Sequence, residues 1–236
     1  GVGGAVLYSL TGNVVNGPQM KQLVQSMQAQ ASIPLLIATD QEGGSVNRLQ
    51  SILGPLPSAM QVGDTGNPQV ATQRGEQDAQ ALASLGINLN FAPVVDVLNV
   101  PYGEGDINDR AFGTTPQLVT EMAGAYLQGL QASHKVAGTL KHFPGLGDVP
   151  TDPHLQLYTL NRSLADLERI DWAPYKQLIA TGQVDVVMST HVVLGAVDPT
   201  EPASLSYPVL TGVLRDQLGF KGVIVTDGVY MKSLWQ

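Results

Sequence analysis

The densest group of chemically active side chains lies in the stretch from Lys141 to His154, which reads Lys-His-Phe-Pro-Gly-Leu-Gly-Asp-Val-Pro-Thr-Asp-Pro-His. Lys141 and His142 can donate hydrogen bonds to hydroxyl groups, and the Gly-Leu-Gly turn lets the backbone approach a ligand closely. Asp152 lies two residues before His154, close enough to orient the imidazole ring. The segment therefore predicts a polar pocket that contains a proton-transfer group.

Short apolar runs alternate with segments of helical periodicity along the whole chain. Pro18, Pro68, Pro116 and Pro208 stand where a first helical turn accepts proline, and glycines at 86 and 219 end two helices. The runs predicted as strands are residues 5–8, 35–39, 89–91, 136–140, 184–189 and 223–226. This alternation predicts a parallel sheet in a TIM-type (β/α) barrel, organised as one domain over residues 1–236.

A polar residue stands at the end of four of these predicted strands. These residues are Asp40, Lys141, His191 and Asp227. In a (β/α) barrel the carboxyl ends of all strands open on the same face, where active sites lie. We therefore expect residues far apart in the sequence to converge there.

The predicted barrel is incomplete, because six strands are visible where a closed barrel has eight. We expect strands to be missing at both ends of the chain. Either the barrel stays open or a neighbouring chain completes it. Unpaired strand edges promote association, so self-association through the open barrel edges is a further expectation.

The composition is typical of a soluble, acidic enzyme. The 236 residues carry a formal net charge of −8, which argues against nucleic acid or an anionic membrane surface as a partner. No run of eighteen apolar residues exists, so no membrane span is predicted. Cysteine is absent, which excludes disulfides, zinc-thiolate sites and cysteine nucleophiles. The chain begins Gly-Val-Gly-Gly and not with methionine, so we expect any signal peptide or lipobox to be missing already, and the sequence does not determine the compartment.

Four segments together resemble a known family. With the stretch that begins at Lys141, the other three are Asp40-Gln41-Glu42-Gly43-Gly44, Arg110-Ala111-Phe112-Gly113 and Val225-Thr226-Asp227-Gly228. Their types and order are similar to those of the N-terminal domain of glycoside hydrolase family 3, in its β-N-acetylhexosaminidase branch. The motifs extend over nearly the whole chain.

The resemblance implies exo-acting, retaining hydrolysis of β-N-acetylglucosaminides through a covalent glycosyl-enzyme intermediate. Asp227 would be the nucleophile, His154 the catalytic acid and base, and Asp152 the partner of His154. The residues implied in substrate binding are Asp40, Arg48, Arg110, Lys141, His142, His191 and Met231. No cofactor and no metal are expected.

Several of these residues have a structural alternative. Asp40 could form an ion pair with Arg48 or Arg110, and His191 could form hydrogen bonds inside the protein. Glu42 has the residue type of a general acid, but the family motif implies that it supports the fold.

Two further residues receive a structural interpretation. We interpret Asp96 as structural and His134 as exposed between a helix and a strand.

The sequence departs from the family pattern at four positions. Leu146 replaces a common histidine, Pro153 a serine, Gly228 a frequent aspartate, and Ser45 a common arginine. None of these changes removes a catalytic group. Pro153 restricts the backbone beside Asp152, and the serine at position 45 would weaken substrate contacts.

Two alternatives to hydrolysis remain at this stage. A phosphorylase would use the same covalent intermediate with phosphate as the acceptor. A barrel fragment could instead bind sugar without turnover. The natural substrate, whether peptidoglycan fragments or chitooligosaccharides, is not determined by the sequence.

Overall fold

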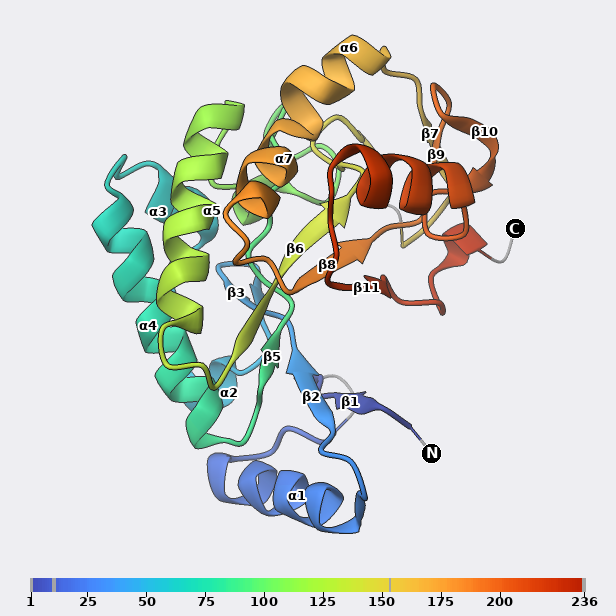
Figure 1. The fold of residues 1–236 in the computed structure, drawn as a ribbon. Coiled ribbons are helices and arrows are strands. Elements are labelled where there is room, and N and C mark those ends of the chain that lie inside the picture. The colour runs from blue at the N-terminus through green and yellow to red at the C-terminus, as the bar shows by residue number, and fades with distance from the viewer. Residues whose placement is uncertain (1, 10–11, 153, 235–236) are drawn as a thin grey trace.

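The computed structural model describes residues 2–9, 12–152 and 154–234, and its centre is a six-stranded parallel sheet (Figure 1). The strands are β1 (Gly4–Val6), β2 (Leu36–Thr39), β5 (Leu89–Asn90), β6 (Ala137–Phe143), β8 (Val186–Ser189) and β11 (Val223–Thr226). They pair in chain order, each parallel to the next. All six predicted strands and the (β/α) barrel fold class are confirmed.

Helices connect the strands, and those with Pro18, Pro68, Pro116 and Pro208 in their first turn begin where the sequence predicts. The main ones are α1 (Gly17–Gln30), α4 (Pro68–Ser84), α5 (Pro116–Gln131), α7 (Ala173–Ala180) and the helix η4 (Pro208–Gln217). The side chains of Asn16, Asn67 and Thr115 accept hydrogen bonds from backbone amides in the first turns of α1, α4 and α5. Gly86 and Gly219 follow helix ends with positive φ angles, which glycine adopts without strain.

Short elements surround the carboxyl ends of the strands. The hairpin β3 (Gln41–Gly43) with β4 (Val46–Asn47) follows β2, and β7 (Tyr158–Leu160), β9 (Val192–Leu194) and β10 (Asp198–Pro202) form a second sheet. The helical segments among them are α2 (Gln50–Leu53), α3 (Ala59–Gly63), η2 (Asn108–Arg110), α6 (Leu164–Asp166), η3 (Leu167–Asp171) and η5 (Lys232–Leu234). The sequence did not predict these strands; β3 and β10, for example, lack the apolar run that marks the predicted ones.

The sheet is open within the described part of the chain. β1 pairs only with β2, and β11 pairs only with β8. Val6 and Val223 on these outer strands are exposed. Self-association through these edges therefore stays a prediction. Among the described residues, no helix combines the length and apolar character needed to cross a bilayer.

Helices α4 and α5 lie side by side along one face of the sheet (Figure 1). Their close approach depends on two glycines. A Cβ atom on Gly75 would lie 2.2 Å from the carbonyl oxygen of Tyr126, and one on Gly129 would lie 2.1 Å from that of Thr72. Each glycine therefore packs directly against the backbone of the neighbouring helix.

We predict that Gly75→Ala destabilises the protein by about 1–3 kcal/mol, because the added methyl group must push the two helices apart. Urea denaturation followed by circular dichroism measures the change. Gly212→Ala is the matched control, since it lies in a helix and a methyl group added there would meet no atom within 4 Å. The control should be neutral or slightly stabilising. Equal midpoints for the two variants would contradict the packing argument.

Candidate active site

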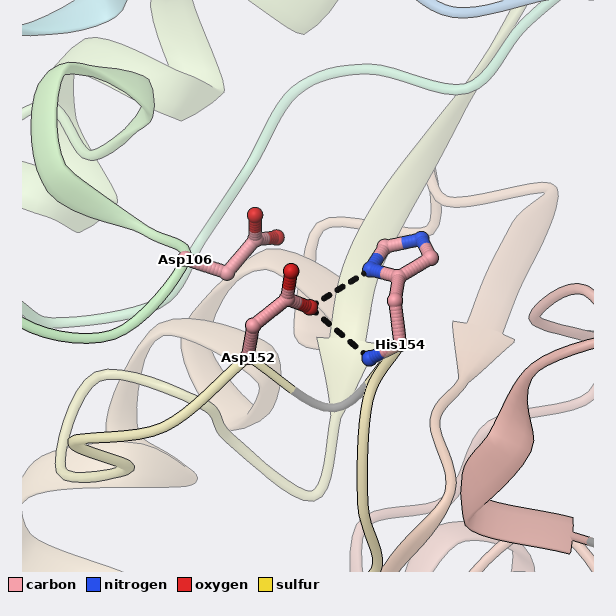
Figure 2. A group of neighbouring side chains, drawn as sticks. All are labelled: Asp106, Asp152 and His154. Atoms are coloured by element: carbon pink, nitrogen blue, oxygen red, sulfur yellow. Dashed lines mark hydrogen bonds and ion pairs between the residues drawn. The ribbon is translucent and has the colours of Figure 1, made fainter.

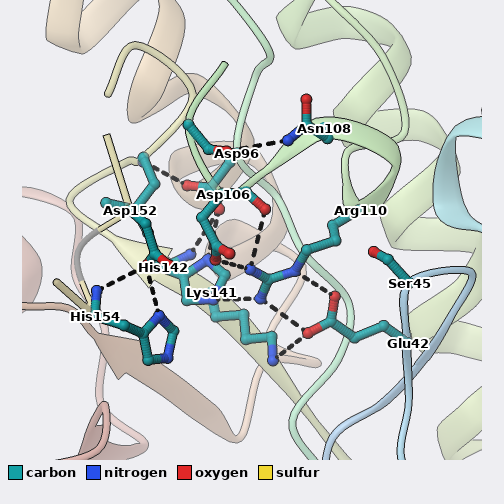
Figure 3. A network of polar contacts seen from close by, with 12 residues as sticks. Glu42, Ser45, Asp96, Asp106, Asn108, Arg110, Lys141, His142, Asp152 and His154 are labelled. Atoms are coloured by element: carbon teal, nitrogen blue, oxygen red, sulfur yellow. Dashed lines mark hydrogen bonds and ion pairs between the residues drawn. The ribbon is translucent and has the colours of Figure 1, made fainter. Parts of the chain in front are cut away.

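The predicted site residues converge at the carboxyl ends of the strands. Asp40 follows β2, Lys141 and His142 lie near the end of β6, and Asp227 follows β11. Strand β6 extends three residues beyond its predicted end, so both basic residues belong to the strand itself. Figure 3 shows how the side chains around Lys141 and His142 point toward one another.

Arg110 and Glu42 form the buried centre of this pocket. Nε and Nη2 of Arg110 donate to the two carboxylate oxygens of Glu42 at 2.8 and 3.0 Å, and Nη1 contacts Asp106. Burial by itself raises the pKa of Glu42, but the charges of Arg110 and Lys141 lower it to about 2. Glu42 is therefore an ionised acceptor, which agrees with a supporting role and not with that of a proton donor.

Lys141 joins two carboxylates from the β2–β3 segment. Its Nζ atom lies 2.7 Å from Asp40 and 2.6 Å from Glu42. Burial by itself lowers the pKa of Lys141, but these two carboxylates raise it above its ordinary value, so the ammonium stays charged. The observed partner of Asp40 is Lys141, and not Arg48 or Arg110 as the structural alternative supposed.

His142 is fixed by partners on both ring nitrogens. Its Nε2 lies 3.0 Å from Nη2 of Arg110 and its Nδ1 lies 2.7 Å from Asp96. A guanidinium can only donate, so Nε2 accepts and Nδ1 carries the proton that Asp96 binds. Asp96 also accepts from the amides of His142 and Leu146. The interpretation of Asp96 as merely structural missed this contact, which orients a pocket residue.

Asp152 and His154 form an exposed pair near Asp227, with the side chain of Asp106 beside them (Figure 2). An oxygen of Asp152 lies 2.8 Å from both Nδ1 and the backbone nitrogen of His154. The side chains are 37% and 45% exposed, respectively. Asp106 lies beside them. Each of the three residues has one atom that could bind a metal ion, and these atoms all lie within 4.8 Å of one another. Pro153, whose effect on this pair was predicted, lies outside the described residues.

Asp227 is held by backbone groups at the end of β11. Its amide donates to the carbonyl oxygen of Ser189 at 2.7 Å, and its Oδ1 accepts from the amide of Gly228 at 2.7 Å. Burial by itself raises the pKa of Asp227, but His142, the Gly228 amide and the charge of Lys141 together bring it below the ordinary value. The carboxylate is therefore ionised at neutral pH.

His191 and Met231 both contact Gly228, the residue that follows Asp227. Nδ1 of His191 is 2.6 Å from the Ser204 hydroxyl, and its Nε2 is 3.2 Å from the carbonyl oxygen of Gly228. The amide of Met231 donates to that same oxygen at 2.9 Å. Both side chains are buried. Both residues therefore support the backbone beside Asp227.

Tyr8 is a pocket residue that the sequence analysis missed. It follows β1, and the guanidinium carbon of Arg48 lies 5.9 Å from the centre of its ring. Burial, the carboxylates of Asp40 and Asp227, and a hydrogen bond with Tyr230 raise the pKa of its phenol. Tyr8 is the last residue of the first predicted strand. A place at the end of a predicted strand is the same signal that identified Asp40, Lys141 and Asp227.

Asp171 lies beneath the turn that follows β6. Its side chain is 1% exposed, and Arg162 donates to its two oxygens at 3.1 and 2.9 Å. Burial and the neighbouring carboxylates Asp96 and Asp148 outweigh Arg162 and raise the pKa of Asp171 to about 7. This carboxyl group therefore takes up a proton in the native protein at much higher pH than in the unfolded chain.

Residues 1–236 match the profile of the glycosyl hydrolase family 3 N-terminal domain. The chain is 37% identical over 238 residues to a beta-hexosaminidase of Nitrosomonas eutropha, covering 98% of this chain and 66% of the relative. It thus spans about two thirds of the length of that relative.

Two solved structures are similar over nearly the whole chain. The family 3 β-N-acetylglucosaminidase from Paenibacillus sp. str. FPU-7 has a TM-score of 0.92 at 38% identity, covering 99% of this chain and 44% of that one. NagZ from Neisseria gonorrhoeae, in complex with N-trifluoroacetyl-D-glucosamine, has a TM-score of 0.86 at 36% identity, covering 96% and 67% respectively.

We predict that Asp171→Asn changes how stability depends on pH. The raised native pKa means that the native state binds this proton more tightly than the unfolded state, so the wild type loses stability as pH rises from about 4 to about 7. The difference in unfolding free energy between wild type and variant should change over this window by on the order of 4 kcal/mol. Denaturant titrations at several pH values measure it. A constant difference across the window would contradict the assignment, and the exposed Asp64→Asn serves as control.

Proposed function

Because the chain belongs to glycosyl hydrolase family 3, as its N-terminal domain, we propose that the protein hydrolyses terminal β-N-acetylglucosaminides with retention at the anomeric carbon. The observation that carries the proposal is the exposed Asp152–His154 pair at the rim of the pocket that contains the ionised Asp227. The names of the relatives, beta-hexosaminidase and β-N-acetylglucosaminidase, support the substrate class.

In this proposal Asp227 is the nucleophile. Its carboxylate attacks the anomeric carbon and forms a glycosyl ester while the bond to the leaving oxygen breaks. This step requires an ionised carboxylate, and the lowered pKa of Asp227 meets the requirement. The contacts of Gly228 with His191 and Met231 hold the backbone that positions it.

His154 transfers the protons. The protonated ring gives its proton to the leaving oxygen, and the neutral ring then removes a proton from the water that hydrolyses the ester. The amide of Lys232 donates to the carbonyl oxygen of His154 at 3.2 Å, which joins this residue to the segment just after Asp227. Asp152 orients the ring through Nδ1 and stabilises its charged form when it appears.

The buried network supplies the sugar-binding groups. Asp40 and Lys141 offer an acceptor and a donor at the pocket floor, and Arg110 and His142 lie next to them. Arg48, partly buried against Tyr8, completes the side of the pocket near β1. Such convergent polar groups suit a polyhydroxylated pyranose.

A comparison of chromogenic substrates tests the proposed function. We expect turnover of an aryl β-N-acetylglucosaminide and little turnover of the matching β-glucoside. The assay is run with EDTA, and with and without inorganic phosphate. Free N-acetylglucosamine as the product under both conditions supports hydrolysis. A glycosyl phosphate would indicate the phosphorylase alternative, and binding without turnover would contradict the proposal.

We predict that Asp227→Asn lowers kcat for an aryl β-N-acetylglucosaminide by about a thousandfold or more, because an amide cannot form the glycosyl ester. Circular dichroism should show an unchanged fold. The exposed Asp216→Asn is the control and should retain wild-type activity. A near-normal rate for Asp227→Asn would remove this residue from the mechanism.

His154→Ala should affect substrates according to their leaving groups. We expect kcat/KM to fall about a hundredfold for poor leaving groups and far less for dinitrophenyl, which departs without protonation. Steady-state kinetics over a graded series of aryl glycosides gives the comparison. Equal losses across the series would argue against an acid role for His154.

A further inference from the structure

Arg162 lies just after the connection between β6 and β7 and contacts the first half of that connection. The connection between β6 and β7 carries Asp152 and His154, and Asp148 lies in its first half, after the turn that follows β6. Arg162 follows β7 by two residues. Its Nε lies 3.7 Å from the carboxylate of Asp148. One guanidinium therefore joins the segment that enters the connection to the segment that leaves it.

The other side of the same guanidinium is fixed to the core. Nη1 of Arg162 donates to both oxygens of the buried Asp171, which ends η3. Asp171 also packs under the turn itself, since a Cβ atom on Gly145 would lie 3.0 Å from Cβ of Asp171. Arg162 thus has a fixed position from which it can hold Asp148.

The turn held in this way also contacts the pocket. The amide of Leu146 donates to Asp96 at 2.7 Å, and Asp96 binds His142 through Nδ1. On the far side of the connection, the amide of Gly105 donates to the carbonyl oxygen of Pro150 at 3.0 Å. The path from Arg162 to the Asp152–His154 pair is therefore a short run of backbone that is anchored at several points.

We propose that Arg162 is a positioning residue for the proton-transfer pair. By joining Asp148 to the buried Asp171, it sets the start of the connection and so the place of Asp152 and His154 at the pocket rim. The effect on catalysis rests on the proposed function of His154. The effect on the connection itself does not.

Arginine suits this position better than lysine. Nη1 of its planar guanidinium donates to Asp171 while Nε faces Asp148, whereas a lysine ammonium is a single point of charge on a flexible stem. Arg162→Lys should therefore keep the charge and lose the connection between the two carboxylates. Asp148→Asn is a milder change, because Asp148 is 36% exposed and its loss leaves the Arg162–Asp171 pair intact.

The first measurement is hydrogen–deuterium exchange of the segment between Asp148 and Tyr158. We expect faster exchange in this segment in Asp148→Asn and Arg162→Lys, with the strands unchanged. Arg169→Lys is the matched control, since Arg169 is 69% exposed and pairs with Asp166 in the same helical region. If the segment exchanges in Asp148→Asn as it does in wild type and the control, the proposal is overturned. This holds whether or not the protein is a hexosaminidase. It also holds when Arg162→Lys does not fold, because Asp148→Asn then decides alone.

The second measurement is kcat/KM over the leaving-group series. Both variants should lose about tenfold with poor leaving groups and little with dinitrophenyl, because only protonation by His154 is disturbed. Equal losses with all leaving groups would overturn the positioning role. Absence of activity in the wild type would instead contradict the proposed function, and the exchange experiment then decides the role of Arg162.

Discussion

The pocket depends on the pairing of charges that are buried at the strand ends. Glu42, Arg110 and Lys141 are all buried, and an ion that leaves water without a partner costs several kcal/mol. Their contacts join the segment after β2, the η2 turn and the end of β6. Because Arg110 and Lys141 both pair with Glu42, these three parts of the chain must meet in one arrangement, and the site is fixed together with the fold.

The same pairing gives the pocket its electrostatic character. Arg110 and Lys141 face four carboxylates, which belong to Asp40, Glu42, Asp106 and Asp227. These six groups carry two positive and four negative formal charges, and adding Arg48 at the side of the pocket still leaves the balance negative. A glycosidase transition state carries positive charge on the sugar ring, so a negative environment that is already in place stabilises it without reorganisation. The network that holds the fold thus also favours the proposed chemistry.

The sequence predicted the strands because each is an apolar run bounded by turn residues, and it located the site because polar residues ended those runs. It did not predict which partners these residues would choose. Asp40 pairs with Lys141, a residue 101 positions away, and the position of Asp96 against His142 depends on a loop that runs beside β6. Such contacts between distant residues follow from the curvature of the sheet, which a local pattern of residues does not encode.

The contrast between the buried network and the exposed Asp152–His154 pair has a physical reason. In the proposed mechanism His154 exchanges protons with water in each turnover, so it has to stay accessible and cannot be fixed by burial as Glu42 is. Its position must come instead from backbone bonds, such as that to Lys232, and from contacts at the ends of its connection. In the proposed mechanism, the residues that hold those ends therefore influence the proton transfer although they do not take part in it.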